Sequence, residues 1–293
     1  MNKLKPWIIS LRLRTLALSF SAMLMGSIVA YRTGCFRWEI LILSAITTLL
    51  LQILANISND YGDAVLGADN ENRVGPTRMI QSGVISLKEM KIAIIICTLL
   101  SFVSGVVLVL VSFKDISLGA FVFIFLGITA IVSAICYTIG RKPYGYRGFG
   151  DIFVFIFFGF FGVAGTYFLH GLKWDWAILL PASTIGFFST AVLNLNNIRD
   201  LETDKVCGKN TLVVKIGRYP ALWYNFFLIL LAWISFWIFT YISENKHLLP
   251  FLTLPLFMMI VWAVFTKNNP ERINSELRNV SLATLLFVIL NIL

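Results

Sequence analysis

The stretch that decides the fold runs from residue 40 to residue 59 and reads ILILSAITTLLLQILANISN, twenty residues without Lys, Arg, Asp or Glu. A helix rises about 1.5 Å per residue, so a helix of this length spans the roughly 30 Å hydrocarbon core of a bilayer. The stretch lacks the alternation of apolar and polar residues that is typical of strands in membrane barrels. It therefore predicts a transmembrane helix.

The same kind of stretch recurs along the whole chain of 293 residues, in which 58% are hydrophobic and 13% are charged. Soluble domains carry roughly 25% charged residues, so this composition excludes a water-soluble globule. Nine uncharged windows predict nine transmembrane helices, at residues 15–31, 40–59, 92–113, 116–140, 152–172, 176–198, 219–243, 248–266 and 279–293. We therefore expect an all-α polytopic membrane protein with a single membrane domain over residues 1–293. The last window is short for a full crossing.

Lys and Arg are unevenly distributed between the connections. If the N-terminus is cytoplasmic and every window crosses, 19 of the 24 basic residues lie inside, as the positive-inside rule requires. The net charge of +9 is then a signal of topology and gives no reason to expect a nucleic acid partner. The long connections also lie inside, so we expect the active site on the cytoplasmic face of the inner membrane.

A polar motif follows the second window. If the helix continues, Asn56, Asn59, Asp60 and Asp63 share one face at positions i, i+3, i+4 and i+7. Asp60 and Asp63 are one turn apart and can converge on a hard divalent cation such as Mg²⁺, which prefers oxygen ligands and bridges to phosphate.

A similar motif follows the sixth window, where Asn197, Asp200 and Asp204 share a face at i, i+3 and i+7. The two motifs form a weak internal repeat, which divides the chain into two four-helix halves plus a C-terminal helix. Two carboxylate clusters on the same side are typical of a metal clamp on a diphosphate. The alternative is that Asp and Asn are ordinary turn residues in solvated loops.

Basic and aromatic side chains occur in the same inside connections. Arg73 and Arg78 follow the first motif, and the middle loop at residues 141–151 combines cations with tyrosines. Cationic side chains can neutralise a diphosphate together with metal ions, so these loops are candidates for the mouth of a binding pocket.

Residues 59–69, 73–83 and 197–212 carry a resemblance to the UbiA-type intramembrane prenyltransferases. Within them the sequence is similar to the branch that prenylates 1,4-dihydroxy-2-naphthoate in menaquinone biosynthesis. The sequence departs from the superfamily pattern at Gly67, where a third Asp is expected, with Asp69 two residues later.

The resemblance implies nine helices around a central cavity that opens to lipid, with Mg²⁺ as cofactor. The expected reaction transfers a polyprenyl group from a polyprenyl diphosphate to 1,4-dihydroxy-2-naphthoate, releases pyrophosphate and CO₂, and gives demethylmenaquinone. Other aromatic acceptors (4-hydroxybenzoate, homogentisate or haem) stay open. An ion-coupled secondary transporter is a further alternative, because polar residues at repeated helix ends also suit an ion site.

The resemblance also assigns roles to individual residues. Mg²⁺ binding falls to Asp60, Asp63, Asp69, Asn197, Asp200 and Asp204. Substrate binding falls to Asn59, Tyr61, Arg73, Arg78, Lys142 and Lys209. Tyr144 and Tyr146 are expected to take part in catalysis by stabilising the allylic cation. Neither the prenyl chain length nor the oligomeric state can be predicted from these residues.

Overall fold

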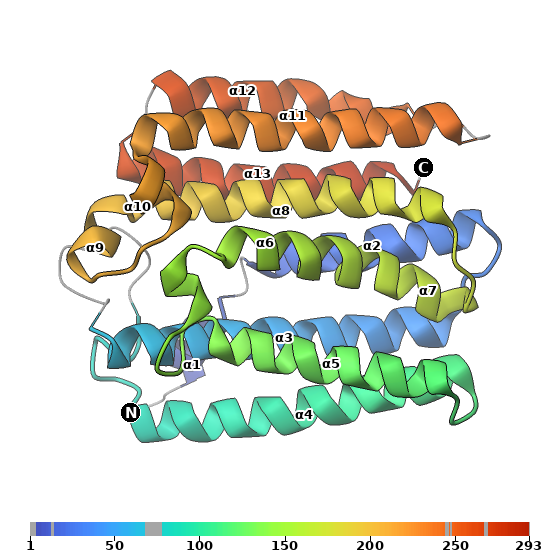
Figure 1. The fold of residues 1–293 in the computed structure, drawn as a ribbon, viewed down its shortest axis with the longest axis horizontal. Coiled ribbons are helices and arrows are strands. Elements are labelled where there is room, and N and C mark those ends of the chain that lie inside the picture. Colours follow the sequence, from blue (N-terminus) through green and yellow to red (C-terminus); the bar gives the residue numbers. More distant parts are fainter. Residues whose placement is uncertain are drawn as a thin grey trace.

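The computed structural model is a bundle of long helices that lie side by side (Figure 1). It describes residues 4–12, 15–67, 78–243, 246, 248–266 and 269–292. Every regular element in this part of the chain is helical, which confirms the predicted all-α class.

Eight segments are long and apolar enough to cross a membrane, judged by length and composition. They are Trp38–Val65 (α3), Leu87–Phe113 (α4), Leu118–Cys136 (α5), Gly150–Gly171, Trp176–Arg199, Arg218–Ile242 (α11), Leu249–Thr266 and Pro270–Leu290 (α13). Leu16–Arg32 (α2) is a ninth, shorter apolar helix of 17 residues. These segments overlap all nine predicted windows.

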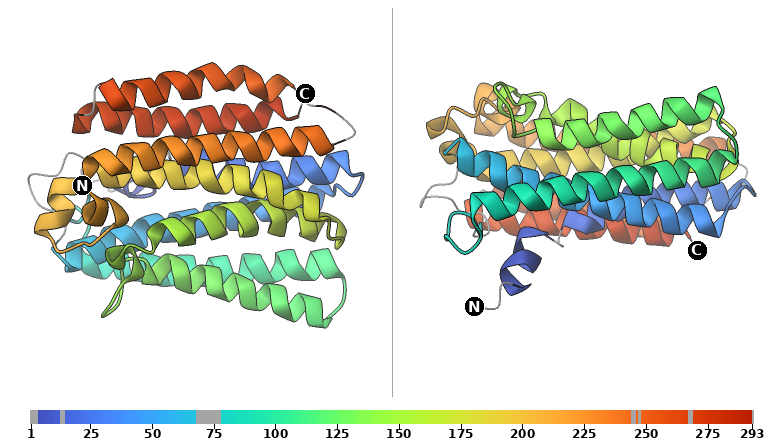
Figure 2. Two further views of the ribbon diagram at one scale, coloured as in Figure 1. Left: turned by 45° about the horizontal axis from the view of Figure 1, so that its top comes forward. Right: turned by 90° about the horizontal axis from the view of Figure 1, so that it is seen from below.

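Three of the spans are composite. Gly150–Gly171 joins α6 (Gly150–Val154), the π-helix η3 (Phe155–Gly165) and α7 (Thr166–Gly171). Trp176–Arg199 joins η4 (Trp176–Ile178) to α8 (Leu179–Arg199), and Leu249–Thr266 joins η5 (Leu249–Thr253) to α12 (Leu254–Thr266). The short helices are α1 (Leu4–Ser10), η2 (Tyr144–Arg147), α9 (Leu201–Val206) and α10 (Leu212–Ile216). Of these, α9 and α10 lie together at one end of the bundle (Figure 1), and α1 projects from its side (Figure 2).

Helix α3 is longer than a membrane requires. Its 28 residues span about 42 Å, against a hydrocarbon core of roughly 30 Å. The helix continues through Asp60 and Asp63, as the sequence predicts, and its last turns lie at the end of the bundle that holds α9 and α10 (Figure 1). The length of α3 thus places both carboxylates beyond the most apolar part of the span.

Helix α13 begins nine residues earlier than its predicted window, at Pro270 instead of residue 279. The early start places charged residues inside the helix. Glu276 is buried, and its Oε1 lies 2.7 Å from the Nε of Arg272, while its Oε2 accepts a hydrogen bond from Asn279. These contacts pair the charge of the carboxylate inside the helix. With its early start the helix has 21 residues, which is enough to span a bilayer.

Aromatic side chains form the centre of packing between α8, α11, α12 and α13. The Phe188 ring stacks on Phe257, with 4.4 Å between centroids, and meets Phe287 edge-on. Many large apolar side chains of α4, α5 and α11 remain exposed on the outside of the bundle, as expected for surfaces that face lipid. Exposed aromatic residues at the end remote from α9 are typical of a membrane interface: Tyr31, Trp38, Trp174, Trp176 and Tyr241.

A large cavity occupies the middle of the bundle. Seven of the nine spans contribute to its wall, namely α2, α3, α4, α5, the segment from α6 to α7, α8 and α13. Helices α11 and α12 contribute no lining residue and pack outside, against α8 and α13. The expected ring of nine helices is therefore corrected to a ring of seven with two helices behind it, because the aromatic packing around Phe188 uses α11 and α12 as a second layer.

Candidate active site

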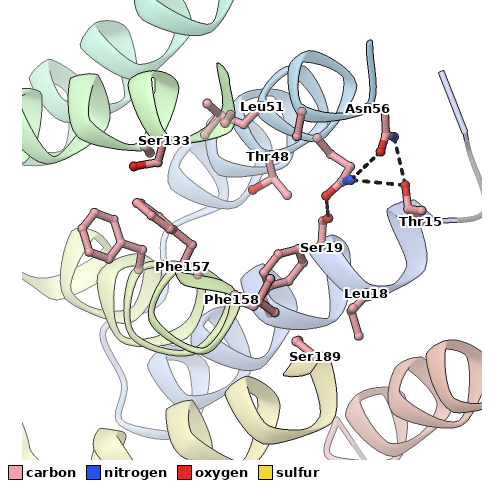
Figure 3. Close-up of a pocket in the computed structure, with 18 of the residues that line it drawn as sticks. Thr15, Leu18, Ser19, Thr48, Leu51, Asn56, Ser133, Phe157, Phe158 and Ser189 are labelled. Carbon is pink, nitrogen blue, oxygen red and sulfur yellow. Dashed lines mark hydrogen bonds between the residues drawn. The ribbon is translucent and has the colours of Figure 1, made fainter. Parts of the chain in front are cut away.

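The cavity has a volume of about 1160 Å³ and two chemically different parts. At the end nearest α9 its wall carries charged side chains, including Asp63, Arg78, Asp204 and Lys209. Toward the middle of the bundle the wall becomes apolar and aromatic, with Phe157 and Phe158 on one side and Leu18 and Leu51 on the other (Figure 3). A cavity with one charged end and a long apolar remainder suits a ligand that has an anionic head and a long apolar tail.

Two arginines hold the first pair of carboxylates. Arg12 forms an ion pair with the Oδ1 of Asp60, and Arg78 reaches the same oxygen at 3.5 Å through its NH1. The NH2 of Arg78 lies 2.6 Å from the Oδ2 of Asp63, and its NH1 donates to the backbone oxygen of Asn59. Burial, followed by the proximity of Arg78, lowers the pKa of the Arg12 guanidinium. The first motif is therefore a compact network of two carboxylates and two guanidiniums.

The second pair of carboxylates lies on either side of a helix break. Helix α8 ends at Arg199, Asp200 takes a non-helical conformation, and Asp204 lies on α9. The expected single face for Asn197, Asp200 and Asp204 on one continuous helix is therefore wrong. Arg199 donates to both oxygens of Asp200, at 2.7 Å each, and the Lys209 ammonium lies 3.5 Å from Asp204. Both carboxylates remain in the cavity wall.

The middle loop connects the two motifs. The Tyr146 hydroxyl donates to the Oδ1 of Asp63 at 2.6 Å, and the Lys209 ammonium lies 5.4 Å from the centre of the Tyr146 ring. Burial and the Asp63 charge raise the pKa of Tyr146, so its hydroxyl stays protonated and can donate. Tyr144 lines the cavity, and its ring stacks on Phe153 with 4.0 Å between centroids. Tyr146 thus bridges the two carboxylate motifs, while Tyr144 belongs to the aromatic wall.

Two oxygens of the second motif lack partners. The Oδ2 of Asp204 and the Oδ1 of Asn197 are buried without a hydrogen-bond partner in the part of the chain that the structure describes. Burial, the largest effect, raises the pKa of Asp204 to about 6 despite the nearby Lys209. Leaving a buried oxygen without a hydrogen-bond donor costs folding free energy. Such oxygens are therefore well suited to bind a metal cation. Within the described residues, no three Asp, Glu, His or Cys side chains converge on one point. The four carboxylates of the two motifs are instead each paired with an Arg or Lys side chain.

The structure brings most of the predicted site residues together. Asn59, Asp63, Arg78, Tyr144, Asp200, Asp204 and Lys209 line the cavity, and Asp60, Tyr146 and Asn197 are in the layer directly behind or beside it. Tyr61 packs into a separate apolar cluster, and Lys142 is exposed and absent from the cavity wall. Asp69 and Arg73 lie outside the described residues.

The sequence interpretation missed two residues of the site. Arg12 was counted only as a topology signal, and Tyr137 was hidden inside an apolar window. Tyr137 lines the cavity and packs edge-on against Tyr144. Arg12 lies three residues before the first window, and this position alone does not identify Asp60 as its partner.

The fold and the site together define a membrane-embedded enzyme that acts on an amphiphilic anion. The chain belongs to the UbiA prenyltransferase family, whose match covers residues 19–286. It is 42% identical, over 99% of its length and 95% of the relative's, to a 1,4-dihydroxy-2-naphthoate octaprenyltransferase of Haemophilus influenzae. It is 46% identical to the octaprenyltransferase of the same name from Escherichia coli, over 76% of this chain and 72% of that one.

A solved structure supports the fold. A UbiA homologue from Archaeoglobus fulgidus, bound to DMAPP and Mg²⁺, superposes with a TM-score of 0.62 over 96% of this chain and 98% of the homologue. The two sequences are 15% identical, so the likeness concerns the fold alone.

Proposed function

We propose that this protein transfers a polyprenyl group from a polyprenyl diphosphate to 1,4-dihydroxy-2-naphthoate, with release of pyrophosphate and CO₂ and formation of demethylmenaquinone. The observation that carries the proposal is a continuous series of contacts between charged and polar side chains at the polar end of a long aromatic cavity. The series runs through Asp60, Arg78, Asp63, Tyr146, Lys209 and Asp204. A diphosphate head fits the polar end, and a prenyl tail fits the apolar remainder.

The residues present fit Mg²⁺ as the cofactor. Contacts through Tyr146 and Lys209 link Asp63 to Asp204. The unpartnered oxygens of Asp204 and Asn197 are candidate ligands. Asp60 and Asp200 complete the set of oxygen donors. Bound Mg²⁺ would neutralise the diphosphate oxygens as negative charge develops on the leaving group. The homologue with bound DMAPP and Mg²⁺ supports this choice of metal and donor.

The basic residues bind the diphosphate in this proposal. Arg78 lies between the first two carboxylates, and Lys209 lies beside the third. With metal bound to the carboxylates, these two cations would turn toward phosphate oxygens, for which the planar Arg fork is well suited. Tyr146 keeps Asp63 oriented through its short hydrogen bond.

The aromatic wall protects the allylic cation that forms when the C–O bond breaks. Tyr144 and Phe153 stack on each other, and Phe157 continues the same wall. Aromatic faces attract cations by roughly 0.5–2 kcal/mol each, more where water is excluded. The wall therefore stabilises the cation and keeps water from capturing it before the acceptor does.

The identity of the acceptor and the orientation of the protein in the membrane are supported by separate observations. The relatives from Haemophilus influenzae and Escherichia coli are named for 1,4-dihydroxy-2-naphthoate, which supports the same acceptor here. The excess of Lys and Arg in the connections at the carboxylate end supports a cytoplasmic N-terminus and an active site that faces the cytoplasm from the inner membrane.

The proposal is tested by product analysis with purified protein in detergent. With octaprenyl diphosphate, Mg²⁺ and 1,4-dihydroxy-2-naphthoate, mass spectrometry should find a prenylated product that has lost CO₂. The variants Asp63→Asn and Asp204→Asn should lower the rate of product formation by about 100-fold or more. The control Asp115→Asn changes an exposed acid in the turn after α4, at the end of the bundle remote from the carboxylates, and should not lower the rate. Product formed only from 4-hydroxybenzoate, homogentisate or haem, or full activity of the two site variants, would overturn the proposal.

A further inference from the structure

A cluster of polar side chains lies deeper in the cavity than the carboxylates. It consists of Thr15, Ser19, Gln52 and Asn56, all of which line the cavity (Figure 3). The amide nitrogen of Gln52 donates to Thr15 at 3.2 Å and to Asn56 at 3.1 Å, and the Ser19 hydroxyl donates to the Gln52 carbonyl. Asn56 also donates to Thr15 and to the backbone oxygen of Leu11. Polar groups at this depth are costly and are typical of a ligand site.

Arg12 covers this polar cluster on the side of the carboxylates. Its backbone oxygen accepts hydrogen bonds from both the amide and the hydroxyl of Thr15, at 2.9 Å each. Its φ of 48° is in the left-handed region, which is uncommon for a residue other than glycine and recurs at functional sites. The guanidinium lines the cavity and meets Asp60.

The order of contacts separates Arg12 from the diphosphate site. From the polar cluster the contacts run through Arg12, Asp60, Arg78 and Asp63, and continue through Tyr146 to Lys209 and Asp204. The diphosphate of the proposed function belongs between Asp63 and Asp204. Arg12 is at the opposite end of this series, in the cavity wall and next to Thr15 of the polar cluster.

In the proposed function the aromatic acceptor has to lie beside the diphosphate end of the prenyl donor. Its attacking carbon must come within about 3–3.5 Å of the prenyl carbon that bears the diphosphate. Gln52 is eight residues before Asp60 on α3, which is about 12 Å deeper along the helix, and Asn56 is about 6 Å deeper. The polar cluster therefore flanks the point where the diphosphate ends and the prenyl chain begins.

We propose that Arg12 binds the carboxylate of the aromatic acceptor and that the cluster of Thr15, Ser19, Gln52 and Asn56 receives its ring hydroxyls. This role deepens the proposed function and rests on it. A guanidinium binds a carboxylate through two parallel hydrogen bonds, and hydroxyl and amide side chains can both donate to and accept from a phenolic hydroxyl. Arg12 would be available for this task if Asp60 exchanged its ion pair for a metal ion.

The test measures binding to the full-length protein in detergent with Mg²⁺ and pyrophosphate present. It uses two stable analogues that differ only in the carboxylate: 1-hydroxy-2-naphthoate and 1-naphthol. The variant Arg12→Ala should weaken binding of 1-hydroxy-2-naphthoate by about 10- to 100-fold. It should change binding of 1-naphthol by less than about threefold, since that ligand makes no charged contact. Arg12→Lys keeps the charge without the fork and should fall between wild type and Arg12→Ala.

Controls separate this role from folding and from diphosphate binding. Lys5→Ala removes an exposed cation from the same N-terminal segment and should leave both affinities unchanged. If Arg12→Ala does not fold, Arg12→Gln, which keeps a hydrogen-bond donor for Asp60, takes its place with the same expectation. Affinity for pyrophosphate should be unchanged in either variant when it is measured at saturating Mg²⁺, where the loss of the Asp60 partner no longer affects metal occupancy.

Several results would overturn the proposal. Equal losses for both analogues would show that Arg12 acts only through the fold, and a loss confined to pyrophosphate would make it a diphosphate ligand. Wild-type protein that binds neither analogue would reject the naphthoate acceptor itself, together with this role. Wild-type binding that survives Arg12→Ala unchanged would reject the role of Arg12 alone and leave the proposed function standing.

Discussion

Gly62 is the position where a single methyl group should separate the catalytic helix from its neighbour. It lies on α3 between Asp60 and Asp63 and faces Thr138, which follows α5. A Cβ atom at Gly62 would lie 2.5 Å from the Thr138 hydroxyl oxygen, 2.6 Å from its Cβ and 2.6 Å from its backbone oxygen. Because one of these atoms belongs to the backbone, no side-chain rotation relieves the clash.

The size of the effect follows from those distances. Ordinary contacts between heavy atoms are about 3.5–4.0 Å, so the variant Gly62→Ala must move α3 away from Thr138 by about 1 Å. Overpacking of this kind costs roughly 1–3 kcal/mol of stability. The shift also breaks the Thr138 hydrogen bond to the Ser58 backbone oxygen, now 3.0 Å, and displaces Asp63 from Tyr146. A misplacement of 1 Å can lower a catalytic rate by about 100-fold.

The assay combines initial rates with thermal unfolding in detergent. We expect Gly62→Ala to fold with a lowered midpoint and to lose most of its prenyl transfer activity. The matched control is Gly105→Ala on α4, where an added Cβ meets no atom within 4 Å. Gly105 lines the cavity, so this variant is a control for stability and not for activity. The same methyl group there should leave the unfolding midpoint unchanged or slightly raised, because Ala favours a helix over Gly by about 1 kcal/mol. Equal behaviour of the two variants would refute the reasoning.

Three further substitutions test the site and the packing. Tyr146→Phe removes the hydroxyl that orients Asp63, so we expect the Mg²⁺ concentration for half-maximal activity to rise about 10-fold; an unchanged Mg²⁺ titration would contradict this. Glu276→Ala removes the buried partner of Arg272 and should lower stability by about 1–3 kcal/mol, measured by thermal unfolding; an unchanged midpoint would show that the pair is dispensable. Phe188→Ala removes the central ring of the aromatic packing and should cost about 3–5 kcal/mol, whereas a loss below about 1 kcal/mol would argue against a packed second layer of helices.

The spans could be predicted because the bilayer imposes one length on all of them. The uncharged run at residues 40–59 was long enough by itself, and α3 contains it entirely. The uncharged window after Arg278 was too short to decide whether the last segment spans, and in the structure α13 begins earlier, at Pro270. A charged residue ends a membrane span only when it lacks a partner, and the contacts of Glu276 with Arg272 and Asn279 supply one.

The candidate site was predictable in its residue types and less so in its geometry. Spacing placed Asp60 and Asp63 correctly, because α3 continues as a regular helix through both. Spacing failed for Asp204, because α8 ends at Arg199 and the chain turns before α9. Arg12 was missed for a different reason: its partner Asp60 is 48 residues away in the sequence, and no local pattern reveals a contact between two helices.

The carboxylates of the two motifs at the polar end of the cavity are paired with positive side chains, and this pairing affects how metal and diphosphate would bind. Four carboxylates with little exposure to water each form an ion pair with a cationic side chain: Asp60 with Arg12, Asp63 with Arg78, Asp200 with Arg199, and Asp204 with Lys209. Unpaired, such charges would be strongly destabilising, so the pairs hold the site together in the absence of metal and substrate. In the proposed function, metal bound by the carboxylates would displace the basic side chains from these pairs, and their positive charge would then favour an anion. A diphosphate supplies it, so binding of Mg²⁺ and binding of the prenyl donor should each favour the other, by the reciprocity that holds for any two coupled ligands.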